Sequence, residues 1–413
     1  MKSFTIKPKQ LEFFDWEFGV FFHFGIRTFY EGHVDWDMKP MELSGFAPTE
    51  LNCENWIATA KEAGANYALL VTKHHDGFAN WPSAYTEYSV KNTPWKNGKG
   101  DVVREFTDAC RKYGMKVGLY YSPAQFGSRQ MQGTEYDDYF INQISELLTG
   151  YGAIDYLWLD GCGSENHKYN SARIVKEIRR MQPEILIFDM WDPDVRWGCN
   201  EAGIAPMPNR LVLNELDVAG QIKNDPPIDR TLFLPVECDF RMRLKNWFYS
   251  DRDEDTVKSV SELMALYEYS VGRGANMLIN IGPDRRGLLP DKDAARLLEF
   301  GSEIRRRYGT PLKTVKNPQS TDNRYVVDLE DYTLIDRVIL KEDISAGDKI
   351  RSARVSVIPA LGWLPVPVHQ SMSVGHKLIA TFPPIRTKHI HVEIEGEDGA
   401  SLTEISLVKA EEV

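Results

Sequence analysis

Two kinds of segment alternate along the first three quarters of the chain. From Asn55 onward, a three-part unit repeats. It consists of an amphipathic stretch with helical spacing, then a glycine or proline, and then a short apolar run. Gly64, Gly114 and Gly152 lie where helix C-termini favour a residue that tolerates positive φ, and Pro183 ends a fourth helical stretch. This order predicts alternating helices and strands, as in an α/β domain.

The predicted strands are nearly continuous apolar runs, which are typical of parallel strands buried on both faces. Seven or eight such runs precede residue 285, from "FGVFFHFG" to "ANMLINIGPD", and "RLVLNEL" is one of them. This number favours a (β/α)8-type barrel. A doubly wound open sheet is the alternative, but the Gly-rich phosphate loop that would favour it is missing from "FFHFGIRTFYEGHVDW".

The pattern changes after Gly309 and Pro311 to short β-branched runs separated by turn residues, from "RYVVDL" to "TEISLVK". A chain of 413 residues also exceeds the usual size of a single core. We therefore expect a (β/α)8-like barrel over residues 1–311, which would be the catalytic domain. A smaller C-terminal β-sandwich would follow over residues 312–413.

The composition, with 42% hydrophobic and 26% charged residues, is that of a soluble globular protein. A net charge of -11 disfavours nucleic acid as a partner. The sequence contains no run of about 18 apolar residues, which a membrane-spanning helix would need. No signal peptide is visible, so we expect a cytoplasmic protein, or a periplasmic or secreted one if a signal has been removed. The five cysteines are widely spaced, which argues against a disulfide framework and a structural zinc site.

Reacting groups in such barrels gather at the C-terminal ends of the strands. These ends and the following loops carry carboxylates, histidines and aromatic residues: His23, His74, His75, Tyr120, Tyr121, Asp160, Asp189, Trp191, Glu201, Glu215, Glu237 and Asp239. Paired carboxylates beside aromatic platforms are what cleavage of a glycosidic bond requires. Trp158 would share the strand face of Asp160.

The adjacent His74 and His75 raise the alternative of a metal site. Residues next to each other on a strand point to opposite faces, so both could face one site only if the strand ends before them, as Asp76-Gly77 suggests. No other histidine or cysteine shows ligand spacing. We therefore predict no metal and no cofactor, and neutral imidazoles that bind hydroxyl groups.

Eight motifs in register resemble those of a known family. They are "GVFFHFG", "WD", "VTKHHDGF", "GLYYSP", "LWLDG", "RWGCNEAGIAP", "PVECD" with "WFY", and "GRGANMLINIGPDRRG". In this order they resemble the α-L-fucosidases of glycoside hydrolase family 29, over residues 12 to 310. The resemblance implies a retaining, metal-free exo-glycosidase that removes terminal α-L-fucose from a fucosylated glycan or oligosaccharide.

The resemblance also implies roles for individual residues. The nucleophile falls on Asp160, and the acid/base falls on Glu201 in "RWGCNEAG", with Glu237 as the runner-up and Glu215 third. The implied substrate-binding positions are His23, Trp36, His74, His75 and Tyr121, where Tyr121 rather than Tyr120 takes the aromatic position of the "YYS" motif. Trp158 is a candidate wall for the methyl group of fucose, and Glu237 could line the site.

The combination of "NEAG" with "ECD" and "WFY" is similar to the subfamily that prefers α-1,3 and α-1,4 fucosyl linkages. Two alternatives stay open at this point. One is a retaining glycosidase for another sugar, such as an α-galactoside. The other is a carbohydrate-binding homologue that has lost catalysis. The oligomeric state is left open by the sequence.

Overall fold

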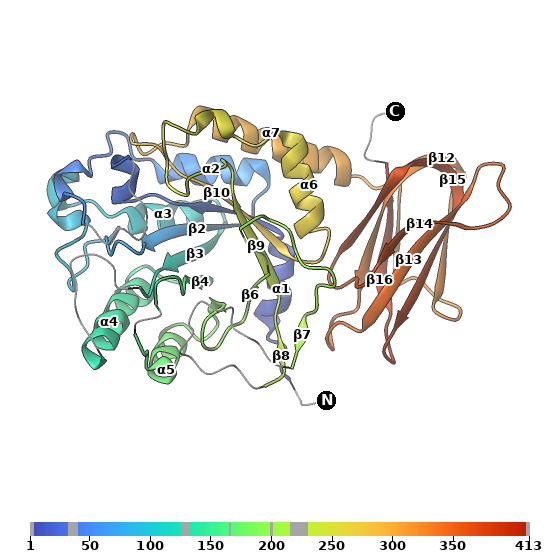
Figure 1. The fold of residues 1–413 in the computed structure, drawn as a ribbon, viewed down its shortest axis with the longest axis horizontal. Helices are drawn as coiled ribbons and strands as arrows, with labels where there is room; N and C mark the ends of the chain where they lie inside the picture. The colour runs from blue at the N-terminus through green and yellow to red at the C-terminus, as the bar shows by residue number, and fades with distance from the viewer. Residues whose placement is uncertain are drawn as a thin grey trace.

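The computed structural model describes residues 4–31, 40–124, 133–164, 167–198, 201–214 and 230–409. A barrel of strands surrounded by helices is followed by an antiparallel domain (Figure 1). Among the described helices, none combines the length and the apolar character that crossing a membrane would need.

The barrel is an eight-stranded parallel sheet with the order β5-β4-β3-β2-β1-β10-β9-β6. Its strands are β1 (Phe18–Phe22), β2 (Tyr67–Lys73), β3 (Lys116–Tyr121), β4 (Tyr156–Leu159), β5 (Leu186–Phe188), β6 (Arg196–Trp197), β9 (Val236–Arg241) and β10 (Asn276–Ile281). The two ends of the sheet meet at a bridge between Phe188 and Val195. This nearly closed sheet confirms the predicted barrel.

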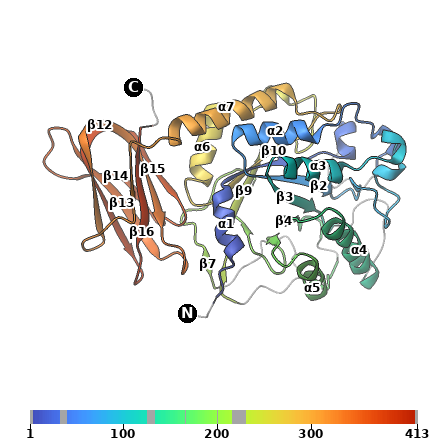
Figure 2. The ribbon, with the colours of Figure 1, turned by 180° about the vertical axis from the view of Figure 1, so that it is seen from behind.

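Helices cover the outside of the barrel (Figures 1 and 2). They are α2 (Cys53–Ala63), α3 (Val102–Lys112), α4 (Thr134–Gly150), α5 (Ser171–Met181), α6 (Val260–Ser270) and α7 (Asp291–Tyr308). Helix α1 (Pro8–Trp16) lies instead at the end where the strands begin, and its Phe13 packs against Tyr156 in the barrel interior. Short 3-10 turns lie between them: η1 (Ile26–Phe29), η2 (Leu43–Gly45), η3 (Val90–Asn92), η4 (Trp95–Gly98) and η5 (Glu254–Thr256). The side chain of Asn52 caps the start of α2, and Gly64 ends that helix at φ +99°.

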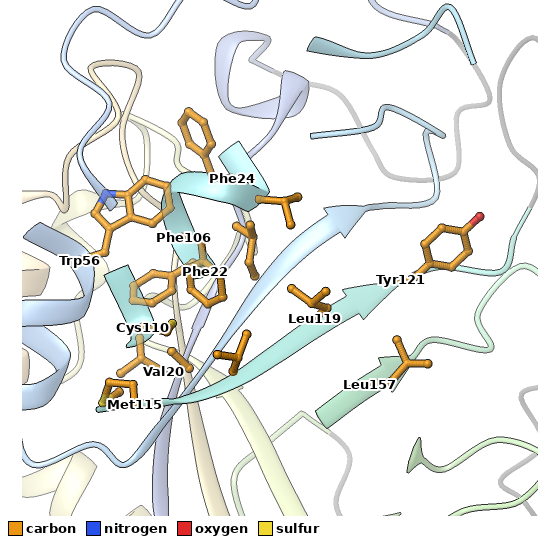
Figure 3. Close-up of a cluster of buried hydrophobic side chains, with 14 of the residues drawn as sticks. Val20, Phe22, Phe24, Trp56, Phe106, Cys110, Met115, Leu119, Tyr121 and Leu157 are labelled. Carbon is orange, nitrogen blue, oxygen red and sulfur yellow. The ribbon is translucent and has the colours of Figure 1, made fainter. Parts of the chain in front are cut away.

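The strands are apolar on both faces because each face packs against a different core. One face meets the helices, and Figure 3 shows Phe22, Leu119 and Tyr121 there with Trp56 of α2 and Phe106 of α3. The other face fills the barrel interior with a second cluster rich in aromatic residues. Burial on both faces explains the continuous apolar runs in the sequence.

One predicted barrel strand was wrong. Within the described part of the run "RLVLNEL", Val212–Leu213 form β7, which pairs with β8 (Leu232–Phe233) in a separate two-stranded sheet. The sixth barrel strand is instead β6, which consists of Arg196 and Trp197. A strand of two residues without an apolar run gives no periodic signal, so the pattern could not reveal it.

The C-terminal domain is a six-stranded antiparallel sheet with the order β11-β16-β12-β15-β13-β14 and a hydrophobic core of its own. This confirms the predicted all-β domain. Its strands are β11 (Lys313–Lys316), β12 (Arg324–Glu342), β13 (Ile350–Pro359), β14 (Val366–Ser371), β15 (Leu378–Gly396) and β16 (Leu402–Val408).

This domain packs against the end of the barrel where the strands begin. Lys377 binds Glu17, the residue before β1, with 2.7 Å between Nζ and Oε1. The rings of His376 and Phe14 stack with centroids 4.7 Å apart. Leu378 bridges Arg273, shortly before β10. The C-terminal ends of the strands therefore lie at the other end of the barrel, away from this domain.

Candidate active site

Asp160 directly follows β4, and its carboxyl group is held in a defined orientation. Oδ1 accepts a hydrogen bond from the backbone N–H of Cys162 at 2.9 Å, and Oδ2 accepts one from the Tyr120 hydroxyl at 2.7 Å. Nε2 of His75 lies 3.5 Å from Oδ2. The side chain is still 19% exposed, so the carboxylate is both oriented and accessible. Such a group can act as a nucleophile or can stabilise positive charge.

His23, just after β1, is a buried neutral imidazole. Its Nδ1 lies 2.7 Å from Oδ1 of Asn280, whose amide group donates to the backbone carbonyl of Trp247 at 2.8 Å. The amide thus turns its oxygen toward His23, which assigns the proton to Nδ1 and leaves Nε2 as an acceptor. Burial lowers the pKa of His23 to about 3, so the ring is neutral near pH 7.

His74 and His75 both follow the last residue of β2, so their side chains do not have to point to opposite faces of the sheet. Nδ1 of His75 lies 2.6 Å from the Ser122 hydroxyl, while its Nε2 faces Asp160. The His74 ring stacks on Tyr120 at 5.6 Å. Burial lowers the pKa of His74, which makes this imidazole neutral as well.

The structure places Tyr120, and not the predicted Tyr121, beside Asp160. The Tyr121 hydroxyl donates to Gln143 of α4 at 2.8 Å, and its ring packs edge-on against Phe140 in the helix layer. Adjacent strand residues point to opposite faces, so Tyr120 must enter the barrel when Tyr121 leaves it. The same alternation that placed Trp158 with Asp160 could have identified Tyr120.

Glu237 lies inside the barrel, enclosed by aromatic donors. It accepts hydrogen bonds from the Tyr67 hydroxyl at 2.7 Å, the Trp158 indole N–H at 2.8 Å and the Tyr156 hydroxyl at 3.2 Å. Burial raises the pKa of Glu237 to about 8. The Trp158 ring in turn stacks on Phe188 at 4.0 Å. Glu237 is therefore a core carboxyl group that orients Trp158.

Glu201 is exposed and lies on the loop between β6 and β7, with φ at +63°. The next residue, Ala202, forms an antiparallel bridge with Phe240 of β9. Two further buried carboxyl groups belong to this part of the barrel, one directly after β5 and one within β9, and sequence reasoning gave neither of them a role. They are Asp189, which accepts from the backbone N–H of Trp197 at 3.1 Å, and Asp239, which accepts from its indole N–H at 2.7 Å.

Two of the predicted positions, Trp36 and Glu215, lie outside the described residues. Among the residues that are described, no group of three or more His, Cys, Asp or Glu side chains could hold a metal ion. The described site thus contains carboxylates, neutral imidazoles and aromatic rings, which are groups that suit a sugar.

The family model described as Alpha-L-fucosidase matches residues 2–307, which include every strand of the barrel. The chain belongs to the alpha-L-fucosidase family. This confirms the family predicted from the motifs. Alpha-L-fucosidase 1 of Arabidopsis thaliana is 36% identical over 297 residues, which cover 69% of this chain and 58% of that protein. The chain therefore spans less than two thirds of the length of this relative.

Two further likenesses agree with membership of the alpha-L-fucosidase family. An alpha-L-fucosidase of Branchiostoma floridae is 27% identical over 327 residues, covering 69% of this chain and 68% of that one. The crystal structure of a glycoside hydrolase 29 family member from an unknown rumen bacterium superposes with a TM-score of 0.89 at 30% identity, over 100% of this chain and 78% of that one.

Proposed function

We propose that this protein is an exo-acting α-L-fucosidase that hydrolyses terminal α-L-fucose from glycans or oligosaccharides with retention of configuration. The observation that carries the proposal is Asp160, an accessible carboxylate oriented by Tyr120 and the Cys162 amide. It stands at the mouth of a barrel of the alpha-L-fucosidase family. Glu201, on a loop that meets β9, supplies the second carboxyl group.

The chemistry proceeds in two displacements. Asp160 attacks the anomeric carbon while Glu201 gives its proton to the leaving oxygen, which forms a fucosyl ester and breaks the glycosidic bond. Glu201, now ionised, takes a proton from water, and the resulting hydroxide attacks the anomeric carbon and releases Asp160. Two inversions give net retention, which requires a distance of about 5 to 5.5 Å between the two carboxyl groups.

Glu201 is a better acid/base than Glu237 because it can reach an incoming glycosidic oxygen. Glu237 is 1% exposed and already accepts hydrogen bonds from three aromatic side chains of the barrel interior. Glu201 is exposed and lies where the mouth of the barrel meets solvent. The alternative of Glu215 lies outside the described residues.

Imidazoles provide the hydroxyl recognition that fucose needs. His23 offers an acceptor at Nε2, and His74 and His75 lie with it around Tyr120 and Asp160, with His23 and His74 ring centroids 5.6 Å apart. The rings of His23 and His74 are neutral and can bind hydroxyls without the cost of burying a charge. Fucose also carries an apolar methyl group, and Trp158, Trp247 and Phe248 offer aromatic walls for it.

Replacing the proposed nucleophile should abolish most of the turnover in a way that azide can restore. Asp160→Ala should lower turnover of an aryl α-L-fucoside by about 10³-fold or more, because no ester can form. Azide occupies the space of the missing carboxylate and should restore turnover, giving a fucosyl azide of inverted configuration. Tyr121→Phe, which changes a hydroxyl in the helix layer, is the matched control and should retain turnover. Turnover close to the parent level in Asp160→Ala would contradict the assignment.

A preference for α-1,3 and α-1,4 linkages is the finer part of the proposal, supported by the "NEAG" and "ECD" motifs. Comparing hydrolysis of a Lewis-type trisaccharide with that of an α-1,2-linked fucoside tests it. A panel of aryl glycosides distinguishes an α-galactosidase, and fucose binding without turnover would identify an inactive homologue.

A further inference from the structure

Strand β9 presents a column of ionisable side chains to the barrel interior. Cys238 and Phe240 pack outward in other hydrophobic clusters, so the alternate residues Glu237, Asp239 and Arg241 face inward. Asp239 is 4% exposed and pairs in register with Leu278, a residue of the interior cluster. It lies two residues closer to the mouth of the barrel than Glu237, a step of roughly 6.6 Å along a strand.

Two contacts connect β9 to the loop that carries Glu201, one of them through Asp239. At the start of the loop, the Trp197 indole N–H donates to Oδ1 of Asp239 at 2.7 Å. Further along, Ala202 bridges Phe240, so Glu201 and Asp239 are each one residue from the same crossing point.

Gly203 fixes that crossing closely. Its φ is +72°, and a Cβ atom there would stand 2.5 Å from Cδ1 of Phe240. The loop therefore approaches β9 as closely as only a glycine permits, two residues after Glu201.

Several carboxyl groups lie around Asp239. The ionisable groups that face this part of the barrel are Asp160, Asp189, Glu201 and Glu237, together with Arg196, Arg241, His23 and His75. Burial raises the pKa of Asp239 to about 6, and the charges of Glu201 and Asp160 act in the same direction. Near pH 7 Asp239 is thus mainly ionised, although it is shielded from water.

We infer that Asp239 is a positioning residue for Glu201. Through Trp197 it holds the start of the acid/base loop, and its buried negative charge favours the protonated form of Glu201 that the first displacement needs. The inference rests on the proposed acid/base role of Glu201. A like charge in a poorly solvated site disfavours ionisation of its neighbour, so the effect requires no contact between Asp239 and substrate.

The consequence is measurable as a change in acid catalysis. Asp239→Asn keeps an oxygen that can accept from Trp197 but removes the charge, so Glu201 should lose its proton at lower pH. In the pH profile of kcat/KM, the apparent pKa of the alkaline limb should fall by about 1 pH unit. Cleavage of a fucoside with a poor leaving group, such as 4-methoxyphenol, should fall by about 10-fold, because this leaving group depends on protonation. The 2,4-dinitrophenyl fucoside needs no proton and should change little.

Trp197→Phe distinguishes the effect of the hydrogen bond between Trp197 and Asp239 from the effect of the charge on Asp239. It keeps an aromatic ring and the ionised Asp239 but removes the indole donor. It should slow the poor leaving group while the alkaline limb stays near that of the parent. Asp336→Asn is the matched control, because it neutralises another buried aspartate, one that pairs with Arg337 in β12 of the C-terminal domain. It should keep the parent pH profile and the parent ratio between the two substrates.

The outcomes separate this inference from the proposed function. An Asp239→Asn enzyme whose alkaline limb and substrate ratio match the parent overturns the role of Asp239, provided that Glu201→Gln selectively slows the poor leaving group. If Glu201→Gln slows both substrates equally, the acid/base assignment itself fails, and the inference fails with it.

Discussion

Glu237 and Asp160 carry similar groups, but their neighbours give them different chemistry. Glu237 is surrounded by the Tyr67, Tyr156 and Trp158 donors, and burial raises its pKa to about 8. Asp160 lies two residues beyond Trp158, where one side of the carboxyl group meets the mouth of the barrel. The first orients an aromatic ring, while the second is accessible at the mouth of the barrel.

The buried proton on Glu237 predicts how stability depends on pH. The folded pKa of about 8 exceeds the ordinary value of 4.5, so the folded protein holds a proton that the unfolded chain has released between these pH values. The contribution of Glu237 to the unfolding free energy is therefore complete below about pH 4.5 and is lost as pH rises through 8. Its size is on the order of a few kcal/mol.

Glu237→Gln removes this titration and retains the shape of the protonated side chain. Urea unfolding at pH 5 and pH 8 should therefore show a smaller loss of stability in this variant than in the parent. Glu184→Gln, at an exposed position, is the control. Equal losses in Glu237→Gln and the parent would show that the Glu237 carboxyl group is not protonated in the folded protein.

Much of the site can be predicted at the level of single residues, since Asp160 and the three histidines lie at strand ends within sequence motifs. The pairing of Tyr120 with Asp160 needed the face of each strand to be assigned. The environment of Glu237 could not be predicted, because Tyr67 and Tyr156 come from two distant strands. Only the closed barrel brings these hydroxyls to one carboxyl group.

At the level of elements, a close approach between β1 and β2 supports the interior. Gly19 lies against the ring of Tyr67, where a Cβ atom would stand 2.5 Å from Cε1 and Cζ. The same tyrosine donates to Glu237. A glycine inside a strand therefore makes room for the ring that holds a core carboxyl group.

Gly19→Ala should force the Tyr67 ring to shift and destabilise the protein by about 1 to 3 kcal/mol through overpacking. Denaturant unfolding measures the loss. Gly150→Ala is a matched control at the end of α4, because a Cβ atom there meets nothing within 4 Å, and it should be neutral or slightly stabilising. An unchanged stability in Gly19→Ala would mean that the interior accommodates the added methyl group.

Alternating helices and strands were predictable because long amphipathic and apolar stretches give clear periods. The sixth strand was not, since β6 has two residues and its backbone is placed by pairing with β9. Its partners were therefore fixed by the closure of the sheet rather than by its own sequence. This short strand also begins the loop that leads to Glu201.

On the scale of the whole molecule, the two domains are joined at the end of the barrel opposite the acidic site. Glu17 is central to this interface: burial raises its pKa, but the Lys377 ammonium outweighs burial and leaves the pKa below its ordinary value. The Tyr267 hydroxyl also donates to Glu17 at 3.2 Å. The C-terminal domain thus supplies the cation for a half-buried carboxylate of the barrel.

Lys377→Met should destabilise the protein by about 2 kcal/mol, because it leaves the Glu17 charge without its partner. The kcat of the folded enzyme on an aryl fucoside should not change, since the contact lies at the other end of the barrel. Thermal unfolding and kcat measured on one preparation test both parts. Lys409→Met, at an exposed lysine, is the control. A selective loss of kcat would indicate that the domain acts on the site.

The sheet is joined less extensively between β5 and β6 than between its other strands, so local opening of the barrel should be easiest there. Long ladders join β1, β2 and β3, whereas the described residues close the sheet through the Phe188–Val195 bridge. Asp189 and Trp197 lie next to this bridge, and the loop that carries Glu201 begins after Trp197. Opening it costs less than separating the long ladders, so amide hydrogens there should exchange first. The barrel should therefore open first where the loop that carries Glu201 begins, while the strands that precede the histidines stay closed.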